Sequence, residues 1–183
     1  MKEVKKLSSP YAIIIIGLPG CGKTTIAQSF IETKDCFYCS SDIVRSKIFD
    51  ELEIKKDRDY SNFELDVIYN IMLYITEIQI QNNVNIVLDG VFRDKKVREY
   101  ISGIIENKGY KLYKFFVTCS DEIALSRVAN RKARGTLSPA GIEGYWEIKE
   151  KFDIPSEDEG FVEIDNSEDT QEDISRILDK FSF

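Results

Sequence analysis

Residues 17–24 carry the spacing in this sequence that is best suited to chemistry on a phosphate group. The segment GLPGCGKT fits the pattern G-x-x-x-x-G-K-[ST] at every position. Its glycines let successive backbone N–H groups point at one phosphate, and the N-terminus of the following helix adds partial positive charge. The Lys23 ammonium can then reach the β- and γ-phosphates, while the Thr24 hydroxyl can ligate Mg²⁺. The segment therefore predicts the binding of a nucleoside triphosphate.

The residues on either side supply the context that a phosphate-binding loop requires. Four consecutive isoleucines, Ile13 to Ile16, are typical of a strand buried on both faces, and residues 26–31 continue with helical spacing. A chance glycine turn is the alternative, and the full match in this context argues against it. Thr25 is expected at the α-phosphate. The predicted nucleotide site comprises Gly17, Leu18, Pro19, Gly20, Cys21, Gly22, Lys23, Thr24 and Thr25.

Two aspartates stand where predicted strands end. Asp42 follows a strand expected at 36–40, and its carboxylate could accept the proton of a hydroxyl that attacks the γ-phosphate. Asp42 could instead cap the next helix. Asp89 ends an apolar strand and is predicted to hold Mg²⁺ or a water bound to it, the alternative being a simple turn before Gly90.

Four arginines are candidates for binding anions. Arg45 lies one helical turn after Asp42 and could hold an anionic acceptor or a phosphate. Arg127, Arg131 and Arg134 are spaced four and three apart, so they share one helix face. Like charges on one face repel unless an anion lies among them, which predicts a lid that closes over the triphosphate. One of the three could instead be a solvated surface side chain.

The elements that must position these residues alternate along the chain. Such alternation implies an α/β fold in which a parallel sheet is covered by helices on both faces. Strands are expected at about 11–16, 36–40, 84–90, 110–119 and 160–166. Helices are expected at about 23–33, 41–49, 63–82, 94–107, 121–134, 140–151 and 170–181. Tyr145 and Trp146 are expected to pack their helix against the sheet.

Length and charge narrow the possible classes of protein. The chain has 183 residues, which suits a single domain over 1–183 with a sizeable core. No apolar run approaches the roughly 20 residues needed to cross a bilayer, so we expect a cytoplasmic protein without a membrane partner. The formal net charge of −7 gives no general attraction to nucleic acid, although a local basic groove stays compatible with it.

Histidine and cysteine content limits the available chemistry further. The chain contains no histidine, which excludes Ser-His and Cys-His catalytic arrangements. Cys36 and Cys39 form a C-x-x-C pair that could suggest a zinc or redox site. They lie on a predicted strand, where residues three apart face opposite sides, and no second pair is nearby. We interpret the cysteines as buried thiols.

Five segments together resemble the small P-loop kinases, and most closely the polynucleotide 5′-kinase and zeta-toxin-like group, also called AAA-type predicted kinases. The resemblance spans residues 11–167, with its motifs in the expected order. These motifs are GLPGCGKTT at 17–25, SSDIVR at 40–45, VLDGVF at 87–92, RVANRKARG at 127–135 and IDNS at 164–167.

The resemblance implies a fold and a set of roles. The fold would be a three-layer α/β P-loop NTPase fold like that of nucleoside monophosphate kinases, with a five-stranded parallel sheet and an arginine-bearing lid at about 127–151. Asp42 would be the general base and Arg45 its partner on the acceptor side. Arg131 would stabilise charge on the transferring phosphoryl group, and Arg127 and Arg134 would contact the nucleotide phosphates. ATP and Mg²⁺ would be the cofactors.

The sequence therefore predicts a kinase that transfers the γ-phosphoryl group of ATP to a hydroxyl. That hydroxyl belongs to a small molecule or to a nucleic-acid 5′ end, and the acidic charge balance argues against a long nucleic acid. The sequence does not name the acceptor. A regulatory NTPase or nucleotide-dependent switch with no phosphoryl acceptor is the alternative.

Overall fold

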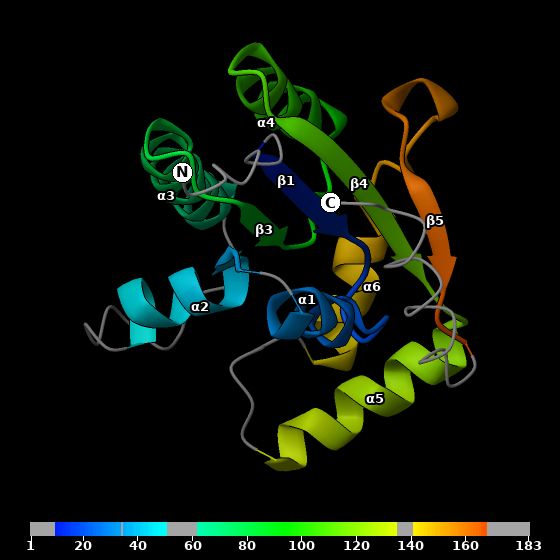
Figure 1. Ribbon diagram of the computed structural model, residues 1–183. Coiled ribbons are helices and arrows are strands. Elements are labelled where there is room, and N and C mark those ends of the chain that lie inside the picture. The colour runs from blue at the N-terminus through cyan, green and yellow to red at the C-terminus, as the bar shows by residue number, and fades with distance from the viewer. Residues whose placement is uncertain (1–9, 34, 51–61, 135–140, 168–183) are drawn as a thin grey trace, which may run out of the picture.

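Five strands form one parallel sheet in the computed structural model, which describes residues 10–33, 35–50, 62–134 and 141–167 (Figure 1). The strand order is β2-β3-β1-β4-β5. The strands are β1 (Tyr11–Ile16), β2 (Phe37–Ser40), β3 (Ile86–Asp89), β4 (Lys111–Thr118) and β5 (Val162–Asp165). Every pairing between neighbours is parallel, which confirms the predicted α/β fold with its five-stranded parallel sheet.

Helices connect the strands close to the predicted positions. They are α1 (Lys23–Thr33), α2 (Ser41–Arg45), α3 (Asn62–Gln81), α4 (Lys95–Asn107), α5 (Asp121–Arg134) and α6 (Ile142–Glu150). The helix expected at 41–49 is not a continuous α-helix, because α2 ends at Arg45 and a wider π-helix follows at Ser46–Asp50. A short 3₁₀ helix, η2 (Glu157–Glu159), precedes β5. The helix expected at 170–181 lies outside the described residues.

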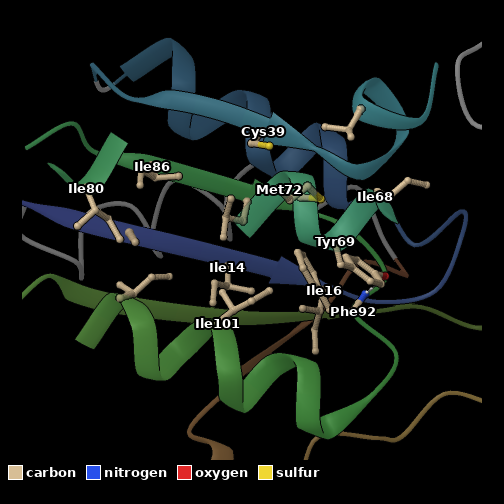
Figure 2. Close-up of a cluster of buried hydrophobic side chains, with 14 of the residues drawn as sticks. Ile14, Ile16, Cys39, Ile68, Tyr69, Met72, Ile80, Ile86, Phe92 and Ile101 are labelled. Atoms are coloured by element: carbon tan, nitrogen blue, oxygen red, sulfur yellow. Dashed lines mark hydrogen bonds between the residues drawn. The ribbon is translucent and has the colours of Figure 1, made fainter. Parts of the chain in front are cut away.

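The central strand β1 is buried along its whole length. Ile14 and Ile16 face one side, where they pack with residues of α3 and α4, as Figure 2 shows. Ile13 and Ile15 face the other side and pack with residues of α1. Each fully buried isoleucine contributes about 1.5–3 kcal/mol relative to an exposed one. The run of four isoleucines therefore anchors both layers of helices to the sheet.

Two expectations about individual side chains need correction. Tyr145 is fully buried, but Trp146 is 47% exposed, so the prediction that both pack their helix on the sheet is wrong for Trp146. Neighbouring residues on a helix point about 100° apart, so a single helix seldom buries both. Of the four cysteines, Cys21 and Cys39 are buried, whereas Cys36 and Cys119 are only partly buried.

The strand ends bring the candidate residues to one edge of the sheet. Ser40, the last residue of β2, pairs with Asp89, the last residue of β3, and Ile15 of β1 pairs with Asp89 from the other side. The phosphate-binding loop follows β1 directly. Figure 1 shows α5 and α6 at the end of the sheet toward which the strand arrows point. None of the described helices is both long enough and apolar enough to span a membrane.

Candidate active site

The loop at Gly17–Thr24 can only be formed with glycines at its crowded positions. Gly22 has φ +99°, a conformation that side chains disfavour, and a Cβ there would lie 2.0 Å from Asn166 Nδ2. Gly20 has φ +83°, and a Cβ there would lie 2.4 Å from the Ala124 carbonyl oxygen. The Asn166 amide donates a hydrogen bond of 2.7 Å to the Cys21 carbonyl. The segment after β5 and helix α5 therefore press directly on the loop.

Lys23 and Thr24 begin α1 at the end of this loop. The Lys23 ammonium donates a hydrogen bond of 2.9 Å to the Leu18 carbonyl, so the side chain folds back across the loop. The Thr24 hydroxyl donates a hydrogen bond of 2.8 Å to Asp89 Oδ2. Both side chains thus point toward the space in which a bound phosphate chain would be held by the loop N–H groups.

Asp89 lies next to Thr24 and is only 2% exposed. Its Oδ2 also accepts a hydrogen bond of 2.7 Å from the Tyr38 hydroxyl. Burial raises the pKa of the Tyr38 phenol above its usual range, and the Asp89 charge raises it further, so Tyr38 stays a donor. No sequence motif marks Tyr38. The one signal that could have found it is its position two residues before Ser40, on the same face of β2.

Thr24 and Asp89 fit the requirements of a Mg²⁺ site. A hydroxyl and a carboxylate are hard oxygen ligands, and Mg²⁺ bound with substrate phosphates usually takes only one or two protein ligands and keeps several waters. The Thr24–Asp89 hydrogen bond shows that the two oxygens lie side by side at the phosphate-binding loop. These residues would hold the ion.

Asp42 lies in the first turn of α2, but it does not cap that helix. The N-cap is Ser40, which makes no side-chain capping hydrogen bond. One pocket at the edge of the sheet, which we call the strand-edge pocket, is lined by Lys23, Thr24, Asp42, Arg45 and Asp89. It encloses about 1050 Å³ of space, including its opening to solvent. The structure therefore brings together the residues that the sequence placed on three separate strand ends.

Other walls of the strand-edge pocket come from residues that no sequence motif marks. Helix α3 contributes Leu65, Ile68 and Tyr69, and the segment after β3 contributes Val91 and Arg93. Helix α6 and the residue after it cover another side. Their lining residues are Gly144, Glu147, Ile148 and Lys151. These residues come from elements far apart in the sequence, so no local pattern marked them as a group.

The three arginines of α5 are described to different extents. Arg127 lies at the phosphate-binding loop, called the nucleotide loop from here on. Its Nη1 donates to the Gly20 carbonyl at 3.5 Å and its Nη2 to the Asn166 carbonyl at 3.1 Å. Arg131 and Arg134 follow on the same helix, and their side chains lie outside the described part of the structure. Arg127 is therefore the predicted lid arginine that the structure places beside the loop.

An ion pair joins the start of α5 to α6. The Asp121 carboxylate accepts a hydrogen bond of 2.7 Å from the Tyr145 hydroxyl and forms an ion pair with the Lys149 ammonium. Hydrogen bonds from Lys149 and Tyr145 hold the pKa of the Asp121 carboxyl below its usual value. This contact fixes the helix that carries Arg127 relative to the helix that lines the strand-edge pocket.

The parallel sheet, the glycine loop and the neighbouring acidic residues define a P-loop NTPase fold. Residues 13–153 match the sequence model of the AAA domain family, and because this match covers most of the chain, the protein belongs to that family. No curated protein matches the sequence significantly.

Solved structures with a similar fold include several kinases. One is a Chloroflexus aurantiacus protein assigned provisionally as a kinase, with a TM-score of 0.75, 20% identity and coverage of 94% of this chain and 97% of that one. Chaetomium thermophilum Kti12, in complex with ADP-AlF3, has a TM-score of 0.71, 17% identity and coverage of 92% and 96%.

The Mycobacterium tuberculosis APS kinase, in complex with AMPPNP and APS, is a third similar structure. It has a TM-score of 0.66, 12% identity and coverage of 93% of this chain and 96% of that one. The chain thus has the fold of P-loop kinases, as the resemblance of its motifs predicted.

Proposed function

We propose that this protein is an ATP-dependent kinase that transfers the γ-phosphoryl group to a hydroxyl of an acceptor bound in the strand-edge pocket. The observation that carries the proposal is that Asp42 shares this pocket with Lys23, Thr24 and Asp89. A carboxylate that can accept a proton therefore lies in the same space as the residues that bind phosphate and metal.

The donor side of the reaction depends on the nucleotide loop. The loop N–H groups and the Lys23 ammonium hold the phosphates, and Thr24 and Asp89 would hold Mg²⁺. When bound, Mg²⁺ neutralises negative charge on the β- and γ-phosphates. Tyr38 keeps the Asp89 carboxylate oriented toward Thr24 through its own hydrogen bond. The nucleotide site is completed by Gly17, Leu18, Pro19, Gly20, Cys21, Gly22 and Thr25.

The acceptor side depends on Asp42 and Arg45. The oxygen of the acceptor hydroxyl forms a bond to the γ-phosphorus, and the Asp42 carboxylate accepts the proton that this hydroxyl loses. The bond from the γ-phosphorus to the bridging oxygen breaks, and ADP leaves with that oxygen. Arg45 holds the acceptor one helical turn further along α2.

The arginines of α5 neutralise charge that develops during transfer. We assign Arg131 to the transferring phosphoryl group, and Arg127 and Arg134 to the nucleotide phosphates. We assign residues 127–151 to a lid and residues 1–183 to a single kinase domain, with residues 135–140 of that lid outside the described part of the chain. The position of Arg127 beside the Gly20 carbonyl supports this arrangement.

One kinase of similar fold and the charge of this chain support a small-molecule acceptor rather than a nucleic-acid end. The APS kinase of similar fold was solved in complex with both AMPPNP and APS. The present chain has a formal net charge of −7, which opposes the binding of a long polyanion. We therefore assign the hydroxyl to a small molecule. A regulatory NTPase is the second candidate, and no observation on the pocket favours it.

The substitution Asp42→Asn tests the proposal. It removes the base but leaves the phosphate-binding loop intact, so we expect phosphoryl transfer to fall by about 10²–10⁴-fold while the affinity for ATP stays unchanged. Transfer is measured with labelled ATP and a panel of acceptors, and ATP affinity by calorimetry. Asp66→Asn, on the exposed face of α3, is the matched control. Full transfer activity in Asp42→Asn would exclude Asp42 as the base.

A further inference from the structure

We propose that the acceptor is a small hydroxyl compound that carries a carboxylate or phosphate group, and that Arg45, Arg93 and Lys151 bind this anionic group. The proposal rests on the proposed kinase function, because it concerns the acceptor of that same reaction. It adds two residues, Arg93 and Lys151, which no sequence motif marked.

Three cationic side chains line the acceptor part of the strand-edge pocket, and each comes from a different element. Arg45 comes from α2, Arg93 from the segment after β3, and Lys151 from the end of α6. Two carboxylates, Asp42 and Glu147, line the same part. Lys23 and Asp89 also line the pocket, but they belong to its nucleotide side. The residues that line this part therefore carry one more positive than negative charge, and Asp94, which contacts Arg93, is not among them. In a protein of net charge −7, such a site is a basis for selecting an anion.

The Arg93 side chain is largely buried where it lines this pocket. It is 15% exposed, and its Nε donates a hydrogen bond of 3.3 Å to Asp94 Oδ2. A guanidinium carries five N–H donors in a planar fork, so it can contact a carboxylate of the protein and an anionic ligand at the same time. Arginine matches a carboxylate or phosphate group with two parallel hydrogen bonds.

The backbone beneath Arg93 is fixed by contacts from three directions. The Arg93 carbonyl accepts hydrogen bonds of 3.0 Å from Arg98 Nη1 and of 2.9 Å from the Asp153 N–H. The preceding residue, Phe92, has φ +43°, a conformation that bulky residues rarely adopt. Its N–H donates to the Tyr69 hydroxyl at 3.0 Å. A strained backbone that its surroundings hold in place is typical of ligand-binding positions.

The neighbouring side chains show that this strained segment is also well packed. The rings of Tyr69 and Phe92 stack with centroids 5.1 Å apart, and Figure 2 shows them side by side near the end of β1. Asp153, which binds the Arg93 carbonyl, lies two residues after Lys151. This hydrogen bond therefore connects the backbone at Arg93 to the segment that follows Lys151.

The rest of the pocket fits the carbon skeleton of a small molecule. Leu65, Ile68 and Val91 provide an apolar wall, and Ile148 of α6 provides another. Pockets of this kind use apolar walls for most of the contact area and a few polar groups for orientation. An acceptor with a hydroxyl at Asp42 and an anionic group at the three cations would be oriented at both ends.

Matched pairs of acceptors test this proposal. Transfer from labelled ATP is compared between D-gluconate and D-glucitol, and between glycerol 3-phosphate and glycerol, which differ mainly in the anionic group. We expect kcat/KM to be at least 10-fold higher for the anionic member of a pair. A 5′-hydroxyl oligonucleotide is included, and its use in strong preference to every small acceptor would overturn the proposal.

Variants then connect the preference to its residues. Arg93→Gln and Lys151→Gln should each lower the preference for the anion by at least 5-fold, mainly by raising KM for the anionic acceptor. Transfer to the neutral member and KM for ATP should stay unchanged, which a general loss of structure would not allow. Arg93→Lys should restore part of the preference. Lys96→Gln, an exposed charge on α4 outside the pocket, is the matched control.

Binding decides the question if none of these acceptors is phosphorylated. Calorimetry with the protein saturated with AMPPNP and Mg²⁺ should then show that gluconate or glycerol 3-phosphate binds at least 10-fold more tightly than its neutral counterpart. Arg93→Gln should remove that difference. Equal binding, or no binding of either anion, would overturn the inference. Transfer to neutral acceptors alone would overturn this inference but leave the proposed kinase function standing. Anion binding that depends on Arg93, with no transfer to any acceptor, would count against the kinase function only.

Discussion

Asp89 is the residue at which the sheet, the nucleotide loop and the second strand of the site meet. It ends β3, and its carboxylate accepts hydrogen bonds from Thr24 at 2.8 Å and from Tyr38 at 2.7 Å. Two donors on one carboxylate oxygen restrict its orientation. The outer partner of a metal ligand commonly sets how well that ligand binds its ion.

If Asp89 holds Mg²⁺ as proposed, substituting Tyr38→Phe should weaken Mg²⁺ binding without removing a proposed metal ligand. We expect the Mg²⁺ concentration for half-maximal activity to rise by about 10-fold, because Asp89 loses the donor that orients it. The measurement is a Mg²⁺ titration of ATP turnover. Tyr74→Phe, at a hydroxyl on the exposed face of α3, should behave like the unaltered protein. An unchanged Mg²⁺ requirement in Tyr38→Phe would show that this hydrogen bond has no role at the proposed metal site.

At the scale of elements, a buried ion pair fastens α4 to η2. Arg98 Nε and Nη2 donate to the two Glu159 carboxylate oxygens at 2.7 and 2.8 Å, and the two side chains are 1% and 3% exposed. Burial alone would raise the pKa of the Glu159 carboxyl, but hydrogen bonds from Arg98 and the Ser156 N–H outweigh it and lower the pKa. The pair is therefore charged at neutral pH. It holds the Phe92–Arg93 segment, because Arg98 Nη1 also donates to both carbonyls.

Breaking this pair should destabilise the whole fold. Glu159→Gln leaves the Arg98 charge buried without its carboxylate, which we expect to lower the free energy of unfolding by about 3–5 kcal/mol. Urea denaturation measures the loss. Asp158→Asn is the matched control, since Asp158 pairs with Lys95 on the exposed surface, and we expect it to change stability far less. A small effect of Glu159→Gln would mean that water reaches the pair.

At the scale of the whole molecule, the nucleotide loop connects segments from both ends of the described chain. Asn166 after β5 donates to Cys21 in the loop, and Arg127 of α5 donates to Gly20 and to Asn166. A ligand that fills the loop therefore contacts a region whose packing depends on β1, α1, α5 and β5 together. Binding to such a region should stabilise the folded chain as a unit.

Thermal unfolding with Mg²⁺ and AMPPNP tests this coupling. At a ligand concentration 100 times the Kd, we expect the free energy of unfolding to rise by about 2.7 kcal/mol. Lys23→Ala should lose most of that gain, because the ammonium no longer contacts the phosphates, but it should unfold normally without nucleotide. Lys96→Ala should keep the full gain. Equal stabilisation of Lys23→Ala and the unaltered protein would place the nucleotide somewhere other than this loop.

The sequence by itself determined the described strands and helices closely and predicted the phosphate-binding loop. The bounds of α1 and α5 agree with the prediction at both ends, and the five predicted strands are all present. Local patterns carry this information, because apolar periodicity and glycine spacing depend only on residues near one another in the chain. For the same reason, local spacing was enough to select the loop, Asp42 and Asp89 as candidates.

Only the tertiary structure decided which side chains share a pocket. The strand order brings Tyr38 beside Asp89, and the packing of α6 brings Lys151 to the pocket that Arg93 also lines. It also separated Tyr145, which is buried, from Trp146, which is 47% exposed. These contacts join residues distant in the chain, so they follow from how helices and strands pack rather than from any local pattern.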